Sequence, residues 1–147
     1  MPQKSIFIVS FAYILAISQV SLGLPPLTDN LSEIDNQCSK ALEVVRVKIS
    51  NSQARAIYNS DSNSTNLSVV LNHKDTSDES WWRVENILQS KQYLTSVGGQ
   101  ILKSCKQFSS VYICVVNSEC FKRVFIDDQG KVRLVKLGFG EPEQLLN

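Results

Sequence analysis

Apolar residues recur at helical spacing in the first third of the chain, after an apolar leader. The stripe consists of Ile34, Cys38, Ala41, Leu42, Val45 and Ile49. It predicts a helix from Glu33 to Ile49, with Ser32 as its N-cap and Asp35 at the third helical position. Val45 to Ile49 also alternates as a β-branched strand would, so a strand over these residues is the alternative.

The strongest helical pattern runs from Trp81 to Cys105. Its apolar side consists of Val84, Ile87, Leu88, Leu94, Val97, Ile101, Leu102 and Cys105. Ser90 can end one helix and cap the next, so we expect a kink there. The pair Gly98-Gly99 disfavours a helix by about 2 kcal/mol relative to two alanines. We interpret the pair as a place where the helix approaches a sheet closely.

Four short apolar runs have the character of strands. They are Leu67–Leu71, Val111–Val116, Phe121–Ile126 and Val132–Leu137. Asp127 to Lys131 predicts a three-residue hairpin loop in which Gly130 supplies the left-handed residue. That loop sets Val124 opposite Leu134 on the face that we expect under the helices. The other face carries Phe121, Phe125, Val135 and Leu137, together with Arg123 and Arg133.

These patterns predict an α+β fold. We expect an antiparallel meander of three to four strands, packed on one long kinked helix, plus the N-terminal helix. The expected division is a signal peptide at 1–23, an extended lead-in at 24–32, one domain at 33–140 and a C-terminal tail at 141–147. The second sheet face is too apolar for plain solvent surface, so it is expected to meet the N-terminal segment or a partner.

The first 23 residues have the layout of a secretory signal peptide. Lys4 gives the opening a positive charge, Ile6 to Val20 is mostly apolar, and Ser21 and Gly23 are small residues suited to a cleavage site. A spanning helix needs about 20 apolar residues, which is more than this run offers. We expect cleavage after Gly23, export to a periplasmic or extracellular space and no stable membrane span afterwards. A permanent membrane anchor is the alternative.

The net charge of the chain limits the classes of partner that we expect. The chain has a formal net charge of +1, and Lys4 in the leader supplies it, so the remainder is neutral. Nucleic acid and anionic membranes are therefore disfavoured, and an unidentified protein is the expected partner.

The four cysteines predict two structural disulfides in an oxidising compartment. Cys114 and Cys120 flank a turn and would lie opposite each other on neighbouring strands, which leaves Cys38 to pair with Cys105. A labile Cys114–Cys120 disulfide is the alternative. The spacings lack C-x2-C and His73 is the single histidine, so we predict neither a metal nor a cofactor.

Apart from the cysteines, few residues of the sequence suggest a catalytic or binding site. His73 with Asp75 or Asp78 could serve a small hydrolase, but no nucleophile motif accompanies it. Trp81 and Trp82 point about 100° apart on a helix. We expect one in the core and the other as a cover or a recognition anchor.

The stretch from Trp82 to Val135 resembles small exported proteins of cyanobacterial type. The likeness rests on Val84–Ser90, on Tyr93-Leu94 and on Ile101–Cys105. Cys114 stands where such proteins tend to have a glycine, and Cys120 where they tend to have an aromatic residue. This replacement of a cross-strand pair supports a Cys114–Cys120 bond. The resemblance implies a bacterial periplasmic or extracellular setting and supplies no activity.

The favoured function is a non-enzymatic exported binding protein. Its partner would meet the second sheet face or the loops around Trp81 and Trp82. The alternatives are the small hydrolase using His73 and an inhibitor of a secreted enzyme. The inhibitor would present a rigid loop, for which the turn at Asn117-Ser118-Glu119 is the candidate.

Overall fold

Three helices and one six-stranded sheet make up the part of the chain that the computed structural model describes, which is residues 29–31, 33–73, 78–138 and 140–146. The predicted signal peptide at 1–23 lies outside these residues. The elements in chain order are α1 (Asn36–Asn51), β1 (Ala54–Asn59), β2 (Asn66–His73), α2 (Asp78–Gln89), α3 (Lys91–Ser104), β3 (Ser110–Val115), β4 (Cys120–Ile126), β5 (Val132–Gly138) and β6 (Glu141–Leu145).

The sheet follows the order of the chain, β1-β2-β3-β4-β5-β6, and it is mixed. Four of its neighbouring pairs are antiparallel, and β2 pairs with β3 in parallel. The α+β class is therefore confirmed, but the purely antiparallel meander of three to four strands was wrong. A parallel pair needs a long crossover, and α2 with α3 supplies it between β2 and β3.

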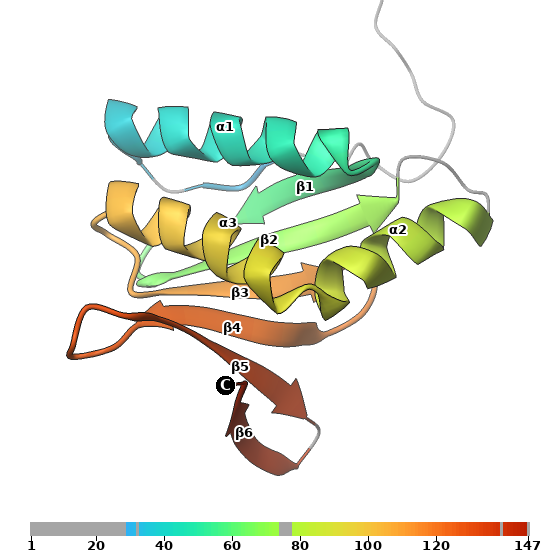
Figure 1. Cartoon of the computed structure of the whole chain (residues 1–147). Coiled ribbons are helices and arrows are strands. Elements are labelled where there is room, and N and C mark those ends of the chain that lie inside the picture. The colour runs from blue at the N-terminus through green and yellow to red at the C-terminus, as the bar shows by residue number, and fades with distance from the viewer. Residues whose placement is uncertain (1–28, 32, 74–77, 139, 147) are drawn as a thin grey trace, which may run out of the picture.

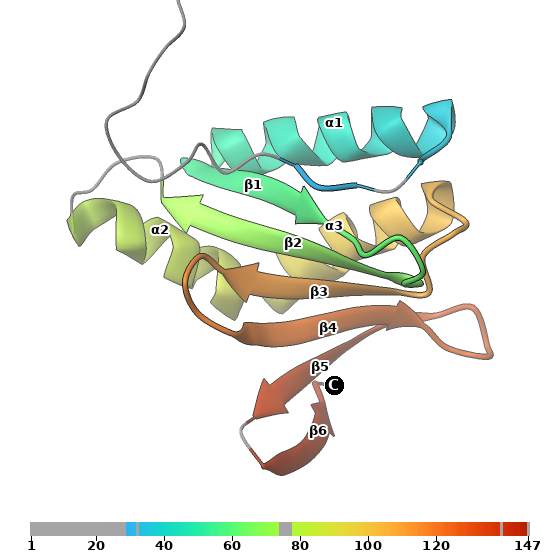
Figure 2. The ribbon, with the colours of Figure 1, turned by 180° about the vertical axis from the view of Figure 1, so that it is seen from behind.

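All three helices lie on one face of the sheet (Figure 1). Seen from behind, the sheet stands in front of the helices, and no described helix covers this side (Figure 2). The glycine pair in α3 allows the close approach that the sequence predicted. A Cβ on Gly98 would lie 2.6 Å from Val124 Cβ, and one on Gly99 would lie 3.0 Å from Val132 Cγ2.

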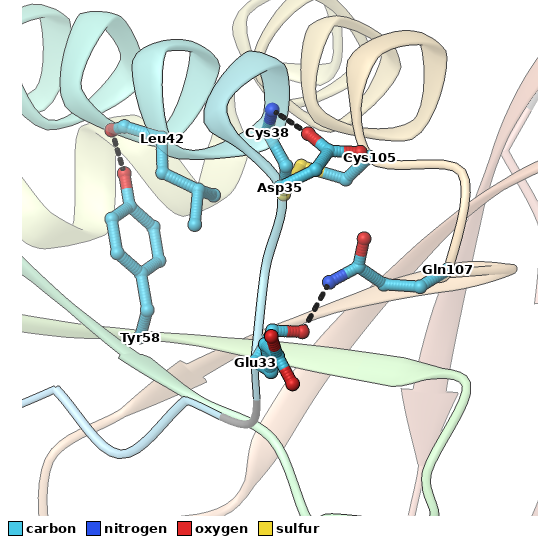
Figure 3. Close-up of a disulfide and its surroundings, with 7 residues drawn as sticks. All are labelled: Glu33, Asp35, Cys38, Leu42, Tyr58, Cys105 and Gln107. Atoms are coloured by element: carbon cyan, nitrogen blue, oxygen red, sulfur yellow. Dashed lines mark hydrogen bonds between the residues drawn. A yellow bond between two sulfur atoms is a disulfide. The ribbon is translucent and has the colours of Figure 1, made fainter.

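The helix α1 begins and ends differently from the predicted range. Its N-cap is Asp35, whose Oδ1 accepts a hydrogen bond from the Cys38 amide at 2.7 Å (Figure 3). Ser32, the predicted cap, lies outside the described residues. The strand alternative over Val45–Ile49 was wrong, because one helical stripe that includes Val45 and Ile49 is buried.

Tyr58 of β1 fixes the helix α1 over the sheet. Its hydroxyl donates to the Leu42 carbonyl at 2.6 Å inside the core (Figure 3). This burial raises the pKa of the phenol, since the charged form would lose its hydration. The Arg46 guanidinium lies 4.8 Å from the centroid of the Tyr58 ring and pairs with Asp29. The contacts join α1, β1 and the residues just before α1.

The single long kinked helix was also wrong, because α2 and α3 are separate helices. Gln89 ends α2, and Ser90 caps α3 by accepting a hydrogen bond on Oγ from the Tyr93 amide at 3.3 Å. The capping role of Ser90 is therefore confirmed. Cys105 follows the last residue of α3, and its disulfide to Cys38 joins that end to the first turn of α1.

The β4–β5 hairpin has the predicted register. Val124 pairs with Leu134 and Ile126 with Val132, and Gly130 has a φ of 76°. Asp127 organises the loop by accepting a hydrogen bond from the Lys131 amide at 2.9 Å and one from Arg133 Nε at 2.6 Å. These bonds, with that from Arg133 as the largest contribution, hold the pKa of Asp127 below its ordinary value.

The two outer strands were both missed. Residues 141–147 were expected as a tail, but Glu141–Leu145 forms β6 and pairs with β5, with Leu145 opposite Val135. At the other end of the sheet, Asn30 forms a parallel bridge with Asn59 of β1. Pro142 sits within the outer strand β6.

Candidate functional site

The sheet face turned away from the helices carries the aromatic and arginine side chains. Because Val124 and Leu134 face the helices, their neighbours along β4 and β5 point the other way. The register places Tyr112, Arg123 and Val135 in one row across β3, β4 and β5. Ser110, Phe125 and Arg133 form the next row. We call this surface the open face. Leu137 lies on it two residues from Val135, and Phe121 lies at its edge, where the pairing of β4 with β3 shifts by one residue.

Arg123 is at the centre of the open face. Its Nε donates to Ser110 Oγ at 3.1 Å, and its Nη1 pairs with the Glu143 carboxylate of β6 at 3.0 Å. The guanidinium carbon lies 5.0 Å from the centroid of the Phe125 ring and 5.9 Å from that of Tyr112. These contacts place a planar cation within cation–π distance of two aromatic rings on the face.

The exposure of the four predicted surface residues differs along the strands. Phe121 is 38% exposed, and Phe125 and Leu137 are half-buried. Val135 is only 4% exposed, and β6 places Leu145, itself 46% exposed, beside it. The face therefore presents a partly open apolar surface, in which Leu145 is a member that the sequence analysis missed.

A polar hollow of about 240 Å³ lies where the open face meets the β1–β2 loop. Its walls come from β1, the loop, β2, β3 and Cys120 at the start of β4, and they carry hydroxyl, amide and carboxylate groups next to one aromatic ring. The residues that supply these groups are Asn59, Asp61, Ser64, Asn66, Ser68 and Tyr112. Runs of Asn, Ser, Asp and Thr such as this loop are usually solvated connectors, so the hollow has no signal in the sequence.

The disulfides are Cys38–Cys105 and Cys114–Cys120, which are the predicted pairings. Cys114 and Cys120 face each other across β3 and β4, and Cys120 borders the polar hollow. No cysteine is left free. Two disulfides in a chain of this size are compatible with an oxidising environment.

We expect Cys114–Cys120 to be reduced before Cys38–Cys105. Cys120 is half-buried, whereas Cys38 and Cys105 are both 0% exposed, so a reductant must open the core to reach them. Limited reduction followed by alkylation and peptide mass spectrometry gives the order. In denaturant the two bonds should lose this difference. Earlier labelling of Cys38 under native conditions would contradict the prediction.

Trp81 and Trp82 are both exposed, at 47% and 66%. The prediction that one of them enters the core was wrong, because Val84 and Ile87 are the residues that α2 buries. Both rings are therefore exposed on α2, a helix that lies on the helix side of the sheet (Figure 1).

The residues of the predicted hydrolase site fall largely outside the described part of the chain, and the described residues hold no metal-binding cluster. His73 is the last residue of β2. The side chains of His73 and Asp78, and the whole of Asp75, lie outside the described part of the chain. Among the described residues, no group of three or more His, Cys, Asp or Glu side chains could hold a metal ion. None of the described helices has the length and apolar character needed to cross a bilayer.

The predicted inhibitor loop is a short turn. Asn117 has a φ of 55°, and the Ser118 amide donates to the Val115 carbonyl at 3.0 Å. The adjoining Cys114–Cys120 bond closes the turn. The turn is therefore compact and held at its base.

Comparison with known proteins gives this chain no family. No protein-family model, no curated protein and no solved structure matches it. The likeness to small exported proteins of cyanobacterial type therefore stays a prediction.

Proposed function

We propose that this chain is an exported, non-enzymatic binding protein that holds a protein partner against its open face. The observation that carries the proposal is the placement of all three helices on the opposite side. It leaves Phe125 and Leu137 around Arg123, and Phe121 at the edge of the face, without a covering helix among the described elements.

The composition of the open face suits protein recognition. Aromatic residues and arginine are enriched where protein interfaces hold most of their binding energy. Arg123 is already oriented by Ser110 and Glu143, so little side-chain entropy is lost when a partner covers it. The two disulfides restrict the sheet and the helices further, as expected for a surface that binds without rearranging.

The other two functions have less support. The hydrolase requires a nucleophile near His73, whose side chain lies outside the described residues. The inhibitor requires a protruding loop, and the turn at Asn117 is closed by the disulfide directly at its base. Neither has an observation as specific as the uncovered face.

Replacing Phe121 with serine should weaken partner binding at least tenfold. Phe121 is 38% exposed, so the change removes apolar contact area from the partner and little from the core. Tagged residues 24–147 would be used to capture partners from the extracellular and periplasmic fractions of the host. Affinity for the captured protein would then be measured by calorimetry for the wild type and the variant.

Two matched variants serve as controls. Val47 lies on α1 and is 51% exposed, so Val47→Ser makes the same kind of change on the helix side and should leave the affinity unchanged. Trp82→Ser tests the exposed tryptophans of α2. Loss of binding with Trp82→Ser and not with Phe121→Ser would move the partner away from the open face. Failure of the wild type to enrich any protein would also contradict the proposal.

A further inference from the structure

The polar hollow beside the open face is a preformed cavity. It lies between the β1–β2 loop, Ser68 of β2 and Tyr112 of β3, and its volume of about 240 Å³ suits a ligand of monosaccharide size. The cavity does not depend on the apolar part of the face, where the protein partner is proposed to bind. The cavity can therefore bind a ligand independently of the protein partner.

Hydrogen bonds hold the loop wall in place. The Ser64 amide donates to the Asp61 carbonyl at 2.9 Å, and the Asn66 amide donates to Ser64 Oγ at 3.0 Å. At the loop's far end, the Ser109 amide donates to the Thr65 carbonyl at 2.7 Å. The loop is thus tied to itself and to the residue before β3, so its side chains meet a ligand with little ordering cost.

The chemistry of the walls selects the ligand. Asn59 and Asn66 each offer an amide that donates and accepts, Ser68 offers a hydroxyl, and Asp61 offers a carboxylate that accepts strong hydrogen bonds. Tyr112 adds an aromatic ring with an apolar face and a polar tip. A ligand that matches these walls carries several hydroxyl groups and one apolar C–H face.

Other ligand classes fit less well. No lysine or arginine lines the hollow, so an anion would meet the Asp61 carboxylate without a compensating charge. An apolar ligand would strip water from the amides and hydroxyls without replacing their hydrogen bonds. A metal ion would find a single carboxylate, which is a poor ligand set for a hard cation.

We propose that this hollow binds one neutral sugar ring, with its hydroxyls on Asp61 and the asparagine amides and its C–H face on Tyr112. The inference goes beyond the proposed protein partner and does not require it. A sugar attached to a larger glycan would leave the hollow across the open face, since the cavity is continuous with that surface at Tyr112.

The test is a titration of ¹⁵N-labelled residues 24–147 with the methyl glycosides of glucose, galactose, mannose and N-acetylglucosamine. At least one should produce saturable shifts at the amides of Asp61, Ser68 and Tyr112. Asp61→Ala should weaken that binding about tenfold or more, because it removes hydrogen bonds to a charged acceptor. Ser68→Val, which fills the hollow and suits a strand, should abolish it.

The controls separate this site from the protein-binding surface. Asp128→Ala removes an exposed loop carboxylate at the β4–β5 hairpin and should leave sugar binding unchanged. Phe121→Ser should also leave it unchanged, so loss of the protein partner and loss of sugar binding can be told apart. The proposal is overturned if none of the four glycosides gives saturable shifts at the hollow. Equal affinity in the wild type and in folded Ser68→Val would overturn it as well.

Discussion

Replacing Cys38 and Cys105 together with alanine should lower the free energy of unfolding by about 4 kcal/mol, the chain-entropy value for a loop of this length. The bond joins residues 67 apart in sequence and ties α1 to the end of α3. Since a typical domain is stable by only about 5–15 kcal/mol, the variant should stand close to the limit of folding. Urea unfolding followed by circular dichroism measures the change.

The second disulfide provides the matched control. Cys114 and Cys120 are only 6 residues apart, so their double alanine variant should lose about 2 kcal/mol. Both variants remove one bond and two sulfur atoms, and therefore the difference between them reports mainly the length of the closed loop. Equal losses, or a larger loss from the short loop, would contradict the prediction.

Gly98→Ala should destabilise the protein by about 2 kcal/mol, although alanine is the better helix former. A Cβ at this position would lie 2.6 Å from Cβ and Cγ1 of Val124, a residue that is 0% exposed. The helix α3 or the strand β4 must therefore move. The loss through overpacking exceeds the gain of about 1 kcal/mol in helix propensity. Chemical denaturation measures the net change.

Gly99→Ala is the neighbouring control. Its Cβ would come no closer than 3.0 Å to Val132 Cγ2, at a half-buried side chain that can shift, so the stability should change little. Adding Val124→Gly to Gly98→Ala should cost less than Val124→Gly costs alone, because the new methyl group gains room only when the Val124 Cβ, 2.6 Å away, is removed as well. Independent, additive effects would show that Gly98 and Val124 do not limit the approach of α3.

Local signals allowed the correct predictions. Gly130 sits in a loop whose length and residue types specify a hairpin, and that hairpin fixed the register of Val124 with Leu134. Ser90 interrupts an apolar stripe with a residue that caps helices well. The pairing of Cys114 with Cys120 follows from a short turn between strands. In each case the deciding residues lie within a few positions of one another.

The misses depend on contacts between distant residues. No residue near Val69 indicates that its strand pairs in parallel with the strand of Ile113. A crossover of two helices brings those strands together. The strand β1 begins with Ala54, a residue of low strand propensity, and β6 contains a proline. Both strands form because a neighbouring strand offers them hydrogen bonds.

The candidate site was predicted in part. Alternation along β4 and β5 gave the side of the sheet on which Arg123 and Phe125 lie, but it did not indicate the register shift beside Phe121. The polar hollow could not be predicted, because its walls come from Asp61 and Tyr112, which are far apart in sequence. The exposure of both Trp81 and Trp82 was also missed, since helix periodicity gives the direction of a side chain but not what lies beyond it.

The two ends of the sheet limit how this protein can recognise another chain. Pro142 removes a backbone donor from β6, and Asn30 already occupies a position beside Asn59 on β1. An extended peptide that tried to join either border as an extra strand would therefore find an incomplete ladder of main-chain partners. Selectivity must then come from side chains on the broad surfaces, where single substitutions can retune it without disturbing the backbone.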